Sequence, residues 1–245
     1  MDASALRPLS IGEILDVSFG LYRSRFSSLL TVALATMAVP LLLDVYVESA
    51  GGVNDHPLFW FGVRILTVVT GTIGTAASTF VVSDSYLGRE SGAGAALARA
   101  MPLVGALIGV SFMVGFLVAV GLILFVVPGC ILLGGLAVSS VVAVVESPIQ
   151  ASAALGRSWN LSRGFRGKVF LTMFTGFFLL VLPSVALAVL AGETEGSLLW
   201  RGLEALLQVL VYPFLYVLTT VLYYDLRVRK EGFDLELLAS TLRPA

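Results

Sequence analysis

Long apolar runs alternate with short polar segments along the whole chain, and this pattern predicts helices that cross a membrane. Residues 26–43 carry no charge, and the run is long enough for one span. Residues 102–145 carry no charge either. At about 1.5 Å per residue they would form roughly 66 Å of helix, over twice the ~30 Å core of a bilayer. This run therefore predicts two spans, with Pro128-Gly129 as the turn between them.

Three further apolar stretches complete a set of six predicted transmembrane helices. The spans are residues 26–43, 61–82, two within 102–145, 169–191 and 203–224. The third span carries a face of small residues, which in lipid allow helix backbones to approach closely. These residues are Gly105, Gly109, Ser111 and Gly115.

A shorter amphipathic helix is predicted before the first span. Ser10 and Glu13 form a capping-box pattern, in which each side chain binds a free backbone N–H at the helix start. Apolar and charged positions then fall on different faces, which favours a helix in the membrane interface over an ordinary cytosolic surface helix. The apolar positions are Ile11, Leu15, Phe19, Tyr22 and Phe26.

Two later segments repeat this arrangement. The sequences AALARAM and AALGRSW align directly and place Arg99 beside Arg157, and Arg23 takes the same place in the first segment. The repeat predicts three units, each with a surface helix, a basic end and a pair of spans. The alternative is that any multi-pass protein has basic residues before spans that start in the cytoplasm. The units are residues 9–83, 90–145 and 146–224, followed by a cytoplasmic tail at 225–245.

The expected fold is therefore one all-α integral membrane domain over residues 1–245. Six transmembrane helices form a bundle, with three amphipathic interfacial helices on the cytoplasmic side and a threefold internal repeat. Composition agrees, because charged residues make up 13% and mean hydropathy is +0.97, whereas a soluble domain has about 25% charged residues. The net charge of −1 argues against nucleic acid, and a lone cysteine, Cys130, argues against a disulfide or zinc cluster.

Lysine and arginine are distributed unequally between the two sides of the predicted spans. Thirteen of the 15 fall on the side of both termini, and only Arg64 and Arg201 fall on the other. Because cytoplasmic loops collect basic residues, both termini are predicted to lie in the cytoplasm. Charged residues before the first span argue against a cleaved signal peptide.

The chain resembles a known bacterial family, named for the glycerophosphoryl diester phosphodiesterase membrane domain. The similar segments are PLSIGEILDVSFGLYRSRF, ESPIQASAALGRSWNLSRG and LYYDLRVRKEGFDLELL, the last of the actinobacterial type. In the proteins that give the family its name, the membrane part precedes a soluble phosphodiesterase barrel, which is absent from these 245 residues. The resemblance implies an integral membrane module of the bacterial plasma membrane without the named activity.

Basic residues before the fifth span form the first candidate site. Arg157, Arg163, Arg166 and Lys168 suit the phosphates of anionic lipids or a protein partner. The alternative is that these charges only set the orientation of the span in the membrane.

Polar residues near the outer boundary form two further candidates. Asp44 and Arg64 flank the first outer loop, where they either pair or simply end their spans by snorkelling. Arg201, Glu204 and Gln208 share one face of the sixth helix. An intramembrane acid is a functional candidate, although a local pair with Arg201 explains Glu204 equally well.

The sequence indicates no catalytic constellation, cofactor or metal site. The only histidine, His56, lies in a short outer loop, whereas a phosphodiesterase would need several histidines and metal-binding carboxylates. We therefore interpret the protein as a non-enzymatic scaffold, partner or regulator in a membrane or envelope process. Its expected partners are the bilayer, anionic lipids or another membrane protein. The alternative is a transporter or channel for a small or lipid-like solute, and a lipid phosphodiesterase ranks third.

Overall fold

The computed structural model describes residues 7–50, 52–89, 91–191 and 198–233, and every element in this part of the chain is a helix. Six segments are long and apolar enough to cross a membrane, which confirms the number of spans predicted from the sequence. They are Phe26–Val47, Pro57–Tyr86, Ala93–Leu124, Val126–Val145, Arg166–Leu190 and Leu199–Glu231. Their lengths and compositions support a multi-pass membrane protein.

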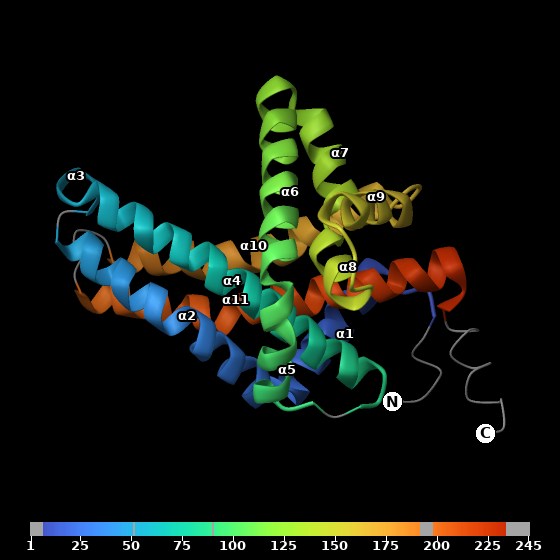
Figure 1. The fold of residues 1–245 in the computed structure, drawn as a ribbon, viewed down its shortest axis with the longest axis horizontal. Coiled ribbons are helices and arrows are strands. Elements are labelled where there is room, and N and C mark those ends of the chain that lie inside the picture. Colours follow the sequence, from blue (N-terminus) through green and yellow to red (C-terminus); the bar gives the residue numbers. More distant parts are fainter. Residues whose placement is uncertain (1–6, 51, 90, 192–197, 234–245) are drawn as a thin grey trace.

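Four long helices, α2, α4, α10 and α11, lie side by side and form the main layer of the molecule (Figure 1). The short helix α1 packs against α11 and α10 near one end of this layer. The helices are α1 (Ile11–Ser24), α2 (Phe26–Ser49), α3 (Gly52–Asp55), α4 (Pro57–Tyr86), α5 (Ala93–Ala100), the 3₁₀ helix η2 (Met101–Leu103), α6 (Val104–Leu124), α7 (Val126–Leu136), α8 (Ser139–Val145), α9 (Ala151–Leu161), α10 (Arg166–Ala191) and α11 (Leu198–Glu231).

The hairpin of α6 and α7 crosses this layer and projects from it (Figure 1). The buried residues Leu107 and Val110 lie in the first half of α6, which packs against α4, α8 and α9. The far end is open, where Phe116, Ile123 and Phe125 are 60%, 82% and 70% exposed. The structure therefore differs from the single six-helix bundle predicted from the sequence. Both lipid and protein neighbours are apolar, so composition alone does not say which faces pack together.

The turn of this hairpin lies at Phe125, so the predicted turn at Pro128-Gly129 is wrong. Phe125 has extended backbone angles, φ −157° and ψ 133°, and α7 begins at the next residue. Pro128 sits in the first turn of α7, where a missing N–H breaks no helical hydrogen bond. Gly129 is needed for close approach, because a Cβ there would lie 2.8 Å from the backbone nitrogen of Leu122.

Two helices continue beyond their predicted ends. α2 passes Asp44 and reaches Ser49, and α11 passes Tyr224 and reaches Glu231. Leu226 is completely buried, so the segment 225–231, which was expected to begin a tail, is a packed helix. A last short helix capped by Asp234 was also expected from the sequence, and that residue lies outside the described part.

The capping box at the start of α1 is confirmed. The Ser10 hydroxyl accepts the N–H of Glu13 at 3.3 Å, and the Glu13 carboxylate accepts the N–H of Ser10 at 2.7 Å. The hydrogen bond from the Ser10 backbone, with further help from Arg7, lowers the pKa of Glu13 to about 2. Ile14 and Leu21 turn into the protein while Phe19 is exposed, so α1 has a packed side and an open apolar side.

Replacing Ser10 with alanine should lower the free energy of unfolding by about 1 kcal/mol, because the N–H of Glu13 loses its acceptor. The measurement is unfolding of the purified protein in detergent. Ser152→Ala removes an exposed serine from α9 and serves as the matched control. Equal stability of the two variants would contradict a structural role for the cap.

Candidate functional site

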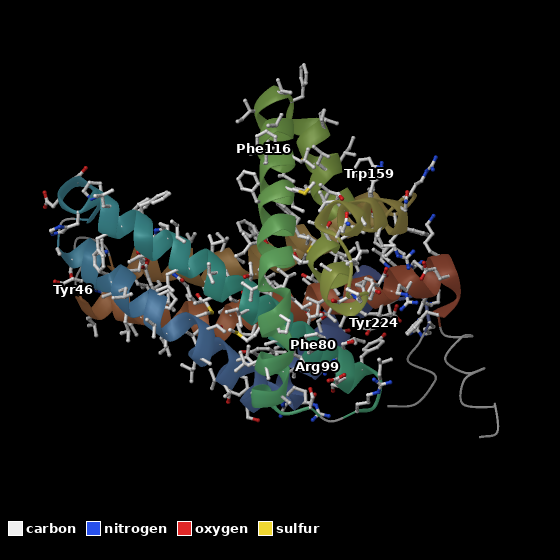
Figure 2. All side chains as sticks on the ribbon, in the orientation of Figure 1. Tyr46, Phe80, Arg99, Phe116, Trp159 and Tyr224 are labelled. Atoms are coloured by element: carbon white, nitrogen blue, oxygen red, sulfur yellow. The ribbon has the colours of Figure 1, made fainter. Side chains whose placement is uncertain are left out.

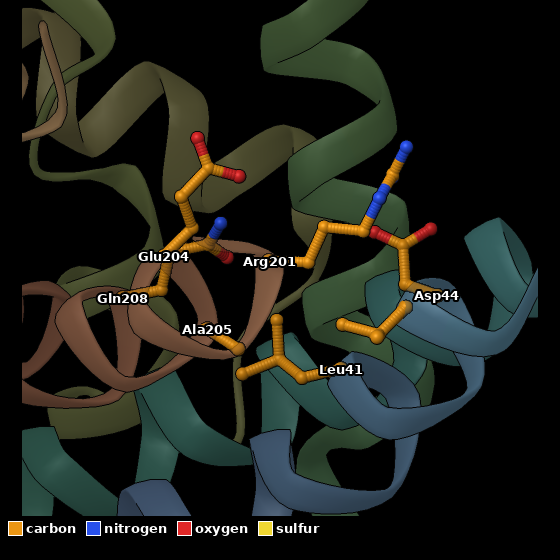
Figure 3. A pocket seen from close by; sticks show the side chains of 7 residues that line it. Leu41, Asp44, Arg201, Glu204, Ala205 and Gln208 are labelled. Carbon is orange, nitrogen blue, oxygen red and sulfur yellow. The ribbon is translucent and has the colours of Figure 1, made fainter. Parts of the chain in front are cut away.

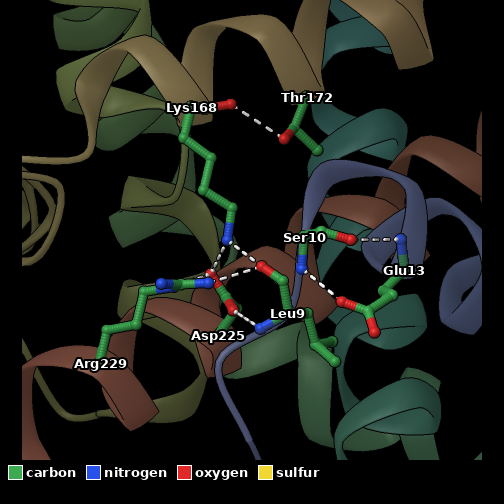
Figure 4. Close-up of polar contacts among 7 residues, drawn as sticks. All are labelled: Leu9, Ser10, Glu13, Lys168, Thr172, Asp225 and Arg229. Atoms are coloured by element: carbon green, nitrogen blue, oxygen red, sulfur yellow. Dashed lines mark hydrogen bonds and ion pairs between the residues drawn. The ribbon is translucent and has the colours of Figure 1, made fainter.

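A buried carboxylate lies where α1, α10 and α11 meet. The side chain of Asp225 has 0% exposure, and both of its oxygens are occupied (Figure 4). One oxygen accepts the N–H of Leu9 at 2.7 Å. The other accepts Lys168 Nζ at 2.5 Å and Arg229 Nε at 2.9 Å. Burying this charge is tolerable because two cations and a backbone donor replace its water.

The same two cations also hold the start of the chain. Lys168 and Arg229 each donate to the carbonyl oxygen of Leu9 at 2.6 Å (Figure 4). Both the N–H and the C=O of Leu9 are therefore bound just before α1 begins. Residues 9, 168, 225 and 229 thus form one polar centre that joins three helices.

A second ionic cluster joins α8, α9 and the end of α11. Arg157 Nε lies 3.0 Å from both oxygens of Glu146, and the same guanidinium pairs with Glu231. Glu231 also accepts Arg227 Nε at 2.9 Å, and the hydroxyl of Tyr223 donates to Glu146 at 2.9 Å. The hydrogen bond to Glu231 raises the pKa of Arg157, so this residue is a permanent cation within the cluster.

A third ion pair joins α4 to α5. Arg99 Nη1 lies 2.7 Å from the carboxylate of Asp84, and its guanidinium lies 4.0 Å from the ring centroid of Phe80 (Figure 2). Nearby, the Tyr224 hydroxyl is hydrogen-bonded to Ser83, and the Tyr224 ring stacks on Tyr86 at 4.9 Å. This contact connects the ends of α4 and α11.

The two arginines that align in the sequence make equivalent contacts. Arg99 pairs with Asp84 near the end of α4, and Arg157 pairs with Glu146 directly after α8. In each case an arginine of a short helix binds an acid near the end of the preceding apolar segment. Arg23, the third aligned residue, is exposed on α1.

The four basic residues predicted as one cluster divide into two kinds. Arg157 and Lys168 turn inward and form the ion pairs described above. Arg163 is exposed, and the guanidinium of Arg166 lies 3.5 Å from the ring centroid of Trp159. Arg163 and Arg166 therefore form no ion pair with a carboxylate of the described residues.

The polar residues at the other end of the layer surround a small hollow. Asp44 and Arg64, which flank the first loop, form an ion pair. Arg201, Glu204 and Gln208 line a hollow of about 60 Å³ together with Asp44. Arg201 extends toward Asp44, whereas the carboxylate of Glu204 points away from Arg201 (Figure 3). The three residues share a face as predicted, but the guanidinium of Arg201 turns to α2.

His56 is exposed at the start of α4. The described residues include no group of three or more histidines, cysteines or carboxylates placed to hold a metal ion. The arrangement is suited to holding helix ends together at one end of the layer and to binding a water or a small polar group at the other.

Asp225, Asp84 and Glu231 were missed by the sequence reasoning. A usable signal was present in the last helix, where Asp225 precedes Arg229 by four residues and Arg227 precedes Glu231 by four. This spacing places each pair on one helix face and indicates a continuing helix. The long-range partners of these residues, such as Leu9, follow only from the fold.

Replacing Asp225 with asparagine should lower the free energy of unfolding by about 3 to 5 kcal/mol, because Lys168 and Arg229 lose their shared counter-charge inside the protein. Asp16→Asn on the exposed face of α1 is the matched control and should change it by less than about 0.5 kcal/mol. Thermal or denaturant unfolding in detergent measures both. A loss for Asp225→Asn no larger than that of the control would show that the buried charge is unimportant.

Comparisons of the chain with protein-family models, with curated proteins and with solved structures find no match. The resemblance to the glycerophosphoryl diester phosphodiesterase membrane-domain family therefore stays a prediction from the sequence.

Proposed function

We propose that the protein is a non-enzymatic membrane scaffold that binds a transmembrane helix of another membrane protein through the outer side of α6. The carrying observation is that the predicted small-residue face of α6 is only partly used within the chain. Gly109 packs near Ala151, where a Cβ would lie 3.4 Å from the Ala151 methyl. Ser111 is exposed, and no atom lies within 4 Å of a Cβ added at Gly115.

A small residue at every fourth position lets a second helix approach closely in lipid. Ser111 and Gly115 have this spacing, and the neighbouring rings of Phe112 and Phe116 are exposed, as Figure 2 shows for Phe116. The two rings stack on each other with centroids 6.4 Å apart beside the small residues, where they would contact a helix that packs against Ser111 and Gly115. The projecting hairpin keeps this surface clear of the four-helix layer.

The charged groups support the same proposal. Asp84, Glu146, Asp225 and Glu231 each bind a cation of this chain and thereby hold helix ends together. Carboxylates that are paired in this way stabilise the packing of the helices and are poorly placed to bind a transported solute. A phosphodiesterase ranks last, because His56 is isolated.

The orientation and the repeat belong to the same proposal. Thirteen basic residues against two support cytoplasmic termini in a bacterial plasma membrane. In this orientation α1, α5 and α9 lie at the cytoplasmic surface, each beside an acid of a neighbouring span. The paired arginines Arg99 and Arg157 support a repeated unit of surface helix and hairpin.

The scaffold function is tested by photo-crosslinking from Phe112 in intact membranes. We expect a crosslinking residue at this position to give a discrete protein adduct. Gly115→Leu should reduce that adduct at least about tenfold, because the larger side chain keeps the partner helix away. Gly62→Leu on α4, where a Cβ also meets open space, is the matched control and should leave the adduct unchanged. Adducts with lipid alone, or a protein adduct that survives Gly115→Leu, would rule out this surface.

A transporter or channel is the second candidate, favoured by the hollow that contains Glu204. Under the scaffold function, proteoliposomes should show no flux of protons or of a panel of small solutes. Glu204→Gln should then change the free energy of unfolding by less than about 0.5 kcal/mol, because the amide retains the shape of the side chain. Wild-type flux that disappears in a normally stable Glu204→Gln variant, but persists in Asp16→Asn, would favour transport.

A further inference from the structure

The corner between α9 and α10 carries a compact basic surface. We call it the corner patch and define it as Trp159, Arg163, Phe165, Arg166 and Lys230. The guanidinium of Arg166 lies 3.5 Å from the ring centroid of Trp159, and Lys230 Nζ lies 5.8 Å from that of Phe165. Arg163 and Lys230 are exposed. Aromatic rings thus contact two of the cations, and the third, Arg163, is exposed three residues before Arg166 in the chain.

The cations of the corner patch keep their charge available. Within the described part of the chain, none of Arg163, Arg166 and Lys230 forms an ion pair with a carboxylate. The acids around them are already bound, since Asp225 holds Lys168 and Arg229 while Glu231 holds Arg157 and Arg227. The patch therefore presents three positive charges that no carboxylate of the described residues pairs with.

The corner patch lies where one span begins and another ends. Arg166 begins α10 and Lys230 lies one residue before the end of α11. The first N–H groups of a helix have no partner within it and also favour an anion. Directly beyond the patch, α10 exposes Leu171, Phe174 and Phe178, which continue into the lipid-facing side of the span.

We propose that the corner patch binds the phosphate of an anionic phospholipid whose acyl chains lie along α10. Arginine is suited to this role because its planar guanidinium offers two parallel hydrogen bonds to phosphate oxygens. Arg163 and Arg166 make these contacts, and Lys230 adds charge from α11. Arg157 and Lys168 do not take part, because their donors already bind Glu146, Glu231 and Asp225. The inference depends on the spans crossing a bilayer and is independent of the protein partner of α6.

The test is native mass spectrometry of the full-length protein in detergent with equimolar phosphatidylglycerol and phosphatidylcholine of the same acyl chains. Wild type should retain phosphatidylglycerol preferentially, and the preference should weaken as salt is added. The double variant Arg163→Gln, Arg166→Gln should bind phosphatidylglycerol about thirtyfold more weakly, the effect of two charges near an anionic surface. Retention of phosphatidylcholine should not change.

Two single variants distinguish lipid binding at the corner patch from a general electrostatic attraction between the lipid and the protein. Arg163→Gln and Arg23→Gln remove the same charge from exposed positions, and only Arg163→Gln should weaken phosphatidylglycerol binding. Because Arg163 is exposed, its replacement leaves the fold intact, and the unfolding midpoint in phosphatidylcholine verifies this. Equal losses for the two single variants, or undiminished binding by the double variant, would overturn the proposal.

Discussion

The arrangement depends most on the burial of one carboxylate. Asp225 has no access to water, so its charge is stable only while Lys168, Arg229 and the N–H of Leu9 surround it. Those groups come from α10, from α11 and from the segment just before α1. Electrostatic compensation therefore helps to fix the position of α1 against α10 and α11, together with the packing of its buried residues Ile14 and Leu21. The neighbouring clusters at Glu146 and Asp84 act in the same way on α9 and α5.

This use of charge differs from the role that the sequence first indicated. Basic residues near spans are expected to set orientation, and their distribution in this sequence predicts cytoplasmic termini. The structure adds a second task for Arg99, Arg157 and Lys168, each of which binds an acid at the end of a span. The residues left over, Arg163 and Arg166, are then distinguished by having no such partner in the described part. The proposal of a lipid-binding site rests on these two residues.

The sequence predicted the six spans because the thickness of a bilayer fixes how many apolar residues a helix needs. It predicted the cap of α1 because a serine followed three residues later by a glutamate lets each side chain bind a free backbone N–H at the helix start. It misplaced the turn at Pro128-Gly129, since proline is equally compatible with the first turn of a helix, and the extended residue is Phe125. The projection of the α6–α7 hairpin and the inward direction of Lys168 depend on contacts between distant residues, which no local pattern contains.

The contact between Leu9 and Asp225 has a consequence for biosynthesis. A ribosome delivers Leu9 first and Lys168 much later, and both precede Asp225, which follows almost the whole of the last span. Until that moment the ammonium of Lys168 has no buried counter-charge, and the start of the chain has no anchor. Closure of the polar centre therefore waits for insertion of the final helix. A protein truncated just before Asp225 would retain five spans and most of the sixth but lack the carboxylate that joins Leu9 to the last helix.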